Sequence, residues 1–169
     1  MHENFFHNIK VYYEDTDAGG VVYYANYLKF LERARTEALV TLGFNNKKIK
    51  EDYGALIVVK SCNIEYKKPS YLEDELKIRS FVKSVTKTSF FMSQLISRDD
   101  ELIVEAKVCL VFVNKDAKPM KVPEVIFKDF KKLHEIDVTE ISGIAIMTDT
   151  DNSKLKAISY YQDIYFSAE

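Results

Sequence analysis

The chain has 169 residues, of which 47% are hydrophobic and 30% charged, with only 5 glycines and 3 prolines. This composition excludes a disordered or fibrous protein and is typical of one globular domain with room for an appendage. A formal net charge of -2 and the lack of a basic cluster interleaved with aromatic residues argue against a nucleic-acid partner. No segment resembles a membrane span or a signal peptide, so we expect a cytoplasmic protein.

A strand is expected over residues 5–14, where apolar and aromatic residues lie among polar neighbours. It leads into the segment DTDAGGVVYYAN, residues 15–26. Gly19 and Gly20 in this segment permit backbone turns barred to other residues, so the chain can leave the strand sharply and bring a carboxylate back toward the next helix. Asn26 is placed to cap that helix.

The central helix is expected from Tyr27 to Leu42, because apolar residues recur there at helical spacing. Their broad face indicates burial on most sides, as in a helix that a sheet wraps around. Gly43 follows as a common left-handed end. A shorter polar helix is expected over residues 45–53, closed by Gly54.

The second half of the chain predicts a run of strands with short links. Segments that are rich in Val, Ile and Leu, or in which apolar and polar residues alternate, occupy residues 55–66, 75–85, 89–98 and 101–114. The length of the last one indicates an internal position in the sheet. Cys62 and Cys109 lie in these apolar runs without metal-ligand spacing, so we interpret them as small buried hydrophobic residues rather than a disulfide. One strand, a buried helix and these further strands indicate an α+β domain with a mainly antiparallel sheet.

The end of the chain has a different character. A short helix is expected over residues 123–135, with Pro123 in its first turn. Residues 136–169 then combine the apolar ISGIAIM, the polar TDTDNSK and the apolar LKAISYYQDIYF, and both a hairpin and a strand followed by a helix stay open. We therefore expect a domain over residues 1–135 and a C-terminal extension over 136–169, whose apolar content predicts docking on the domain, a partner or aggregation when it is loose.

A calcium loop is the first function to test against the paired aspartates. Asp15, Asp17 and Gly20 match the first, third and sixth positions of an EF-hand loop. The twelfth position needs a bidentate glutamate but holds Asn26, and the preceding residues predict a strand rather than a helix. No metal site and no cofactor are expected.

Catalysis by a carboxylate beside the amino end of a helix is the better interpretation of the paired aspartates. His2, His7 and His134 lie outside the glycine turn, and the sequence has no serine-nucleophile or phosphate-loop motif. The amino end of a helix presents unpaired N–H groups and a partial positive charge, which can stabilise negative charge on a carbonyl oxygen. A carboxylate nearby can attack that carbonyl or take a proton from water. We favour Asp17, because Asp15 lies nearer the strand, although a plain turn residue stays open for both.

The segment VYYEDTDAGGVVYYANYLKFLERARTEAL, residues 11–39, resembles the signature of hotdog-fold acyl-CoA thioesterases of the 4-hydroxybenzoyl-CoA thioesterase and YbgC type. A looser similarity in the order of elements continues to Leu133. The resemblance implies a five-stranded antiparallel sheet wrapped around a central helix, and sites at the interface of a homodimer that can pair into a homotetramer. It also implies hydrolysis of an acyl-CoA, short-chain in our reading, to a free acid and coenzyme A.

The resemblance assigns roles to residues of the glycine turn. Asp17 would act as nucleophile or general base, and the backbone N–H of Tyr24 would polarise the thioester carbonyl. Many YbgC-like sequences have histidine where Tyr24 stands, whereas hydroxybenzoyl-type enzymes commonly have tyrosine. An aromatic acyl group therefore stays open beside a short aliphatic one.

Binding residues and rival functions follow from the same resemblance. Lys83, Lys87 and Arg98 are candidates for the phosphates of coenzyme A, against an alternative of ordinary surface charge. One rival is a non-catalytic module that binds acyl-CoA or acyl carrier protein. A second rival, a hotdog dehydratase or hydratase, is disfavoured because no histidine lies near the helix start.

Overall fold

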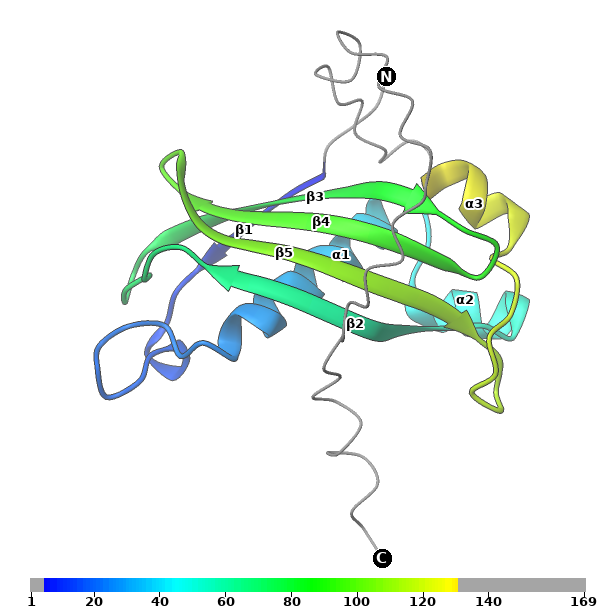
Figure 1. The fold of residues 1–169 in the computed structure, drawn as a ribbon, viewed down its shortest axis with the longest axis horizontal. Coiled ribbons are helices and arrows are strands. Elements are labelled where there is room, and N and C mark those ends of the chain that lie inside the picture. Colours follow the sequence, from blue (N-terminus) through cyan, green and yellow to red (C-terminus); the bar gives the residue numbers. More distant parts are fainter. Residues whose placement is uncertain (1–4, 131–169) are drawn as a thin grey trace, which may run out of the picture. The chain divides into compact units, whose positions relative to one another are not determined.

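A computed structural model describes residues 5–130 of the chain. These residues form an antiparallel sheet with a long helix, α1, against its inner face, and two shorter helices, α2 and α3 (Figure 1). They all fall in the first of two units into which the chain divides, Met1–Ile136. The extension expected over residues 136–169, and its boundary, lie outside the described residues and stay predictions.

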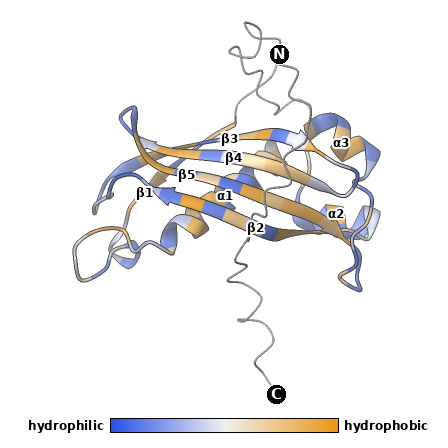
Figure 2. Ribbon diagram, viewed as in Figure 1, coloured by the Kyte–Doolittle hydropathy of each residue, from blue (hydrophilic) through white to orange (hydrophobic). Residues whose placement is uncertain are grey.

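The sheet contains every strand that the sequence predicts. All neighbouring pairs are antiparallel, in the order β1-β3-β4-β5-β2, so β5 is internal as expected and β2 is an edge strand. The strands are β1 (Phe5–Lys10), β2 (Leu56–Tyr66), β3 (Glu75–Val85), β4 (Ser89–Arg98) and β5 (Glu101–Val113). Figure 2 shows these strands as largely hydrophobic with interspersed hydrophilic positions, as a sheet with one buried face requires.

The first strand is shorter than the sequence predicts. It ends at Lys10, and Tyr13–Asp15 form a 3-10 turn instead of continuing it. The physical reason is local: the Asp15 carboxylate accepts the Tyr12 N–H at 2.9 Å, and the Asp15 N–H donates to the Tyr12 carbonyl at 3.0 Å. A short polar side chain that bonds neighbouring backbone in this way competes with the ladder of a strand.

Helix α1 (Asn26–Thr41) is buried along one broad face, as its apolar spacing predicts. Ala34 and Ala38 are fully or almost fully buried, and their small size lets the helix approach the sheet closely. Phe30 and Leu31 fill the space beside them with no exposure. The helix ends where Gly43 takes a positive φ of 83°, a conformation that favours glycine.

Two short helices lie at the end of the sheet opposite the start of α1 (Figure 1). Helix α2 (Asn46–Tyr53) begins with Asn45, whose side chain accepts the Lys48 N–H at 2.8 Å, and it agrees with the predicted polar helix. Helix α3 (Glu124–Phe130) brings Phe130 into the core beside Phe90, with ring centroids 4.5 Å apart.

A polar group crosses the core between α1 and the sheet. Gln94 of β4 is completely buried, and its Nε2 donates to the Leu31 carbonyl at 3.1 Å and to Ser80 Oγ at 2.9 Å. Its Oε1 accepts Arg35 Nη1 at 2.9 Å. Burial lowers the pKa of the Arg35 guanidinium, because removal from water disfavours the charged form. The amide of Gln94 therefore connects α1, β3 and β4.

The two cysteines are free thiols in strand positions, as expected. Cys109 is buried and Cys62 half-buried. Burial raises the pKa of both thiols.

Candidate active site

The loop between β1 and α1, residues 11–25, makes a tight turn around its glycines. The Asp17 N–H donates to the Val21 carbonyl, and the Gly20 N–H donates to the Asp17 carbonyl, both at 2.9 Å. Gly20 has a positive φ of 75°. A Cβ on Gly19 would lie 3.1 Å from Asp17 Oδ1, closer than side chains normally pack. Both glycines thus serve the turn that the sequence predicts, one by its conformation and the other by the space it leaves.

The two aspartates of the turn have different environments. Asp15 is 5% exposed, and its side chain and carbonyl accept the N–H groups of Tyr12 and Tyr23. Asp17 is exposed, and its Oδ1 accepts the Gly19 N–H at 2.8 Å. Within the described part of the chain, Asp17 Oδ2 has no hydrogen-bond partner. Asp15 is therefore a structural residue, whereas Asp17 has an oxygen free for chemistry.

Asn26 does not cap the central helix, and this prediction is wrong. The residue at the cap position is Ala25, which has no side-chain cap bond and is already in the helical region, at φ -72° and ψ -21°. Because helical backbone starts one residue early, the buried Asn26 side chain points back along the loop. Its Nδ2 donates to the Asp15 carbonyl at 3.0 Å and more weakly to the Glu14 carbonyl at 3.5 Å. Asn26 is thus a brace between the 3-10 turn and the helix start.

This brace is testable with Asn26→Asp. Aspartate is as good a helix cap as asparagine, so a cap would tolerate the change. A brace would not, because a carboxylate oxygen would replace the donor that faces the Asp15 carbonyl. We expect the free energy of unfolding in urea to fall by about 1–3 kcal/mol. Asn45→Asp is the matched control, since Asn45 is a true cap acceptor and should keep its stability; equal effects of the two changes would contradict the brace.

Tyrosine side chains line the surface beside the turn. The ring centroids of Tyr23 and Tyr24 are 4.7 Å apart, and Tyr66 from the end of β2 donates its hydroxyl to the Tyr24 carbonyl at 3.2 Å. Tyr24 is 60% exposed. The pKa of the Tyr23 phenol is raised, first by hydrogen bonding to Tyr24 and least by the negative charge of Asp17.

The Tyr24 backbone N–H lies close to the start of α1. Tyr24 lies two residues before the first residue of α1, and among residues 5–130 its N–H has no hydrogen-bond acceptor. Unpaired N–H groups at a helix start, with the helix dipole behind them, form a site for a negatively charged oxygen. The N–H of Tyr24 and the carboxylate of Asp17 belong to the same β1–α1 loop, and the Tyr23 N–H, next to Tyr24, donates to the Asp15 carbonyl at 2.8 Å.

The three cations proposed for coenzyme A are not brought together. Lys83 and Lys87 lie at the end of β3 and in the following turn, where Lys83 Nζ is 4.9 Å from the Phe81 ring centroid. Arg98 lies at the opposite end of β4, where Asp74 and Glu101 engage it at 2.6 and 2.9 Å. Two carboxylates around one guanidinium are not the environment expected of a phosphate ligand.

Metal and membrane features give no further site in this part of the chain. No group of three or more histidine, cysteine or acidic side chains within residues 5–130 is arranged to hold a metal ion. None of the helices in the same range has the length and hydrophobicity needed to cross a bilayer.

Comparisons with known proteins show similarity over the described domain. The model of the thioesterase-like superfamily matches residues 11–130, and a family of unknown function (DUF3047) matches residues 107–165. The acyl-CoA thioester hydrolase YbgC of Escherichia coli O157:H7 is 40% identical over 126 residues, which cover 73% of this chain and 93% of the relative. The acyl-CoA thioesterase YbgC of Haemophilus influenzae is 39% identical over 127 residues, 74% of this chain and 93% of the relative.

Solved structures are also similar to this chain over most of its length. A probable thioesterase from Bartonella henselae superposes with a TM-score of 0.68 at 33% sequence identity, covering 72% of this chain and all of that one. A hypothetical protein from Aquifex aeolicus superposes with a TM-score of 0.71 at 26% identity, covering 75% of this chain and 98% of that one.

Proposed function

The chain belongs to the thioesterase-like superfamily, and from this membership we propose that it hydrolyses short-chain acyl-CoA thioesters with Asp17 as the catalytic carboxylate. The hotdog fold and the enzyme class predicted from the sequence, an acyl-CoA thioesterase, are confirmed by relatives and structures. The acyl chain, the roles of individual residues and the assembly are the proposed part.

One observation carries the assignment of the site. Within residues 5–130, neither Oδ2 of the exposed Asp17 carboxylate nor the N–H of Tyr24, on the same loop near the start of α1, has a hydrogen-bond partner. The thioester carbonyl oxygen would accept this N–H, and negative charge developing on it would be stabilised by the helix start.

Two routes use the same groups. As a general base, Asp17 takes a proton from water while the water oxygen bonds to the carbonyl carbon; the C–S bond then breaks, and the proton passes to the coenzyme A thiolate. As a nucleophile, the carboxylate itself bonds to the carbonyl carbon and expels the thiolate, and water hydrolyses the resulting anhydride. Both routes release one free acid and one thiol for each water consumed.

The exposure of Asp17 in a single chain supports assembly. β2 is a sheet edge within the described domain, and Val59 and Tyr66 on its inner side are 48% and 44% exposed. Pairing of β2 with β2 of a second copy would cover this edge and place each site against its neighbour. We therefore propose a homodimer. A homotetramer is a further proposal, supported by exposed Val58 and Phe91 on the outer face.

A second candidate substrate is an aromatic acyl-CoA. The exposed rings of Tyr23, Tyr24 and Tyr66 beside the turn favour it, because aromatic groups stack on such surfaces. An acyl carrier protein in place of coenzyme A, and a cytoplasmic location, are retained from the sequence as further proposals.

A thiol-release assay over short, long and aromatic acyl-CoAs tests the proposal. We expect the highest kcat/KM for short acyl groups; a maximum for aromatic groups would favour the second candidate. Tight binding of several acyl-CoAs without thiol release would instead support the non-catalytic module, and hydration of an enoyl-CoA would support the hydratase. Acyl carrier protein thioesters assayed in parallel decide between the two carriers.

A further inference from the structure

The β1–α1 loop that holds Asp17 is fastened to the loop between β2 and β3, residues 67–74. The Val11 N–H donates to the Asp74 carbonyl at 2.9 Å, at the start of the β1–α1 loop. The Val22 N–H donates to the Ser70 carbonyl at 2.8 Å, after its glycine turn. The active-site loop is therefore attached on both sides of its turn to the β2–β3 loop.

A chain of contacts leads from a charged side chain to the Asp17 backbone. Asp74 Oδ2 accepts both Arg98 Nη1 at 2.6 Å and the Tyr71 N–H at 2.8 Å. Tyr71 forms an antiparallel β-bridge with Val21, whose carbonyl accepts the Asp17 N–H at 2.9 Å. Each step is a direct contact, and only the first is an ion pair.

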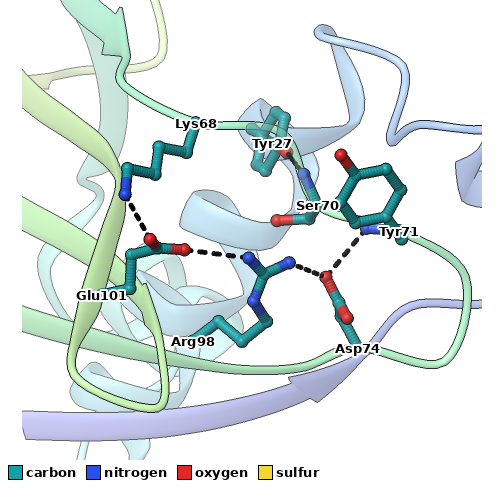
Figure 3. A network of polar contacts seen from close by, with 7 residues as sticks. All are labelled: Tyr27, Lys68, Ser70, Tyr71, Asp74, Arg98 and Glu101. Carbon is teal, nitrogen blue, oxygen red and sulfur yellow. Dashed lines mark hydrogen bonds and ion pairs between the residues drawn. The ribbon is translucent and has the colours of Figure 1, made fainter.

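Arg98 is held in place from its other side as well. Its Nη2 donates to Glu101 Oε2 at 2.9 Å, and Glu101 also pairs with Lys68 (Figure 3). The side chains of Arg98 and Asp74 are 25% and 18% exposed, so both are largely removed from solvent. Figure 3 shows the guanidinium lying between the two carboxylates, with the Tyr71 backbone on the far side of Asp74.

We propose that Arg98 is a positioning residue of the active site, which fixes the β2–β3 loop through Asp74 and thereby the backbone of Asp17. This inference rests on the proposed role of Asp17. Small displacements of a reacting group are costly, since an error of about 1 Å can reduce a rate about 100-fold. An ion pair that contributes little to stability can thus have a large effect on the rate.

The test compares Arg98→Gln, Asp74→Asn and the double variant. Asparagine at position 74 still accepts the Tyr71 N–H but has no charge for Arg98. We expect each single variant to lower kcat about 10- to 100-fold with little change in KM, and the double variant to be no slower than the worse single one, because both break one contact. Arg98→Lys keeps the cation and should recover part of kcat. Lys47→Gln, which removes an exposed pair with Glu51, is the matched control and should match the parent.

Two further measurements separate positioning from phosphate binding. If Arg98 bound coenzyme A phosphates, its loss would raise KM for acyl-CoA and would have no effect on an acyl-pantetheine substrate, which lacks the nucleotide. Positioning predicts the same fold-loss in kcat with both substrates. It also predicts faster amide hydrogen exchange in a peptide covering residues 15–25 of Arg98→Gln, without a change in peptides from β4 and β5.

The outcomes are distinct from those of the proposed function. If Asp17→Asn is as active as the parent, the role of Asp17 is wrong, while exchange in residues 15–25 still decides whether Arg98 orders this loop. Unchanged exchange there, additive losses in the double variant, or an effect confined to KM for acyl-CoA would each overturn the inference. If Arg98→Gln fails to fold, Asp74→Asn alone provides the kinetic and exchange readouts.

Discussion

Asp17→Asn is expected to lower kcat for acyl-CoA hydrolysis about 100- to 10,000-fold, the contribution typical of a positioned acid or base. The fold should survive the change, because the side chain accepts the Gly19 N–H, the one hydrogen bond it makes within the described residues, and an asparagine oxygen can accept it too. The variant therefore removes the charge while keeping the turn. Thiol release at saturating substrate measures the rate, and thermal unfolding should give the same Tm as the parent.

Asp15→Ala is expected to lower stability, whereas Asp17→Asn is expected to lower the rate. Asp15 is buried, and its carboxylate accepts the Tyr12 N–H, so alanine leaves a half-buried donor without its partner. A loss of about 1–3 kcal/mol in the free energy of unfolding is expected. Together the variants test whether Asp17 acts in the reaction while Asp15 stabilises the turn. An Asp17→Asn enzyme that keeps the parent rate, or loses stability as Asp15→Ala does, would show that these roles are wrong.

The strands were predictable because their signal is local. Alternation with a period of two and short polar links define β3, β4 and β5 almost to the residue. The hairpin between the last two is built on Asp99 and Asp100, which both adopt positive φ, at 49° and 72°. Aspartate tolerates this conformation better than most residues, so the turn was visible in the sequence.

The site was predictable only in part, because some of the residues that hold its loop in place lie far from it in the sequence. The glycine turn follows from neighbouring residues, and so does the choice of Asp17 over Asp15, which stays a prediction. The role of Asn26 depends on whether helical backbone starts one residue earlier or later, which cap patterns do not resolve. Arg98 and Asp74 are brought together by strand pairing, and no spacing in the sequence marks two residues 24 positions apart as partners.

The second large effect is expected in the core, from Gln94→Leu. Leucine has a similar volume but cannot replace the hydrogen bonds of the amide to Leu31, Ser80 and Arg35. The hydroxyl of Ser80 is fully buried, and partial burial lowers the pKa of the Arg35 guanidinium. Since a buried polar group left without its partner costs about 1–3 kcal/mol, and a charged one more, we expect the free energy of unfolding to fall by about 3 kcal/mol. Urea denaturation measures it.

Two controls identify the cause. Ile96→Leu changes another fully buried, inward-facing side chain of β4 without touching a polar group, and should cost less than about 1.5 kcal/mol. Arg35→Met combined with Gln94→Leu removes both partners of one bond, so the double variant should lose at least about 1 kcal/mol less than the sum of the single losses. Additive losses would mean that the amide and the guanidinium act independently. If the two are coupled, the placement of α1 on the sheet, and with it the position of the helix start, depends on one buried amide.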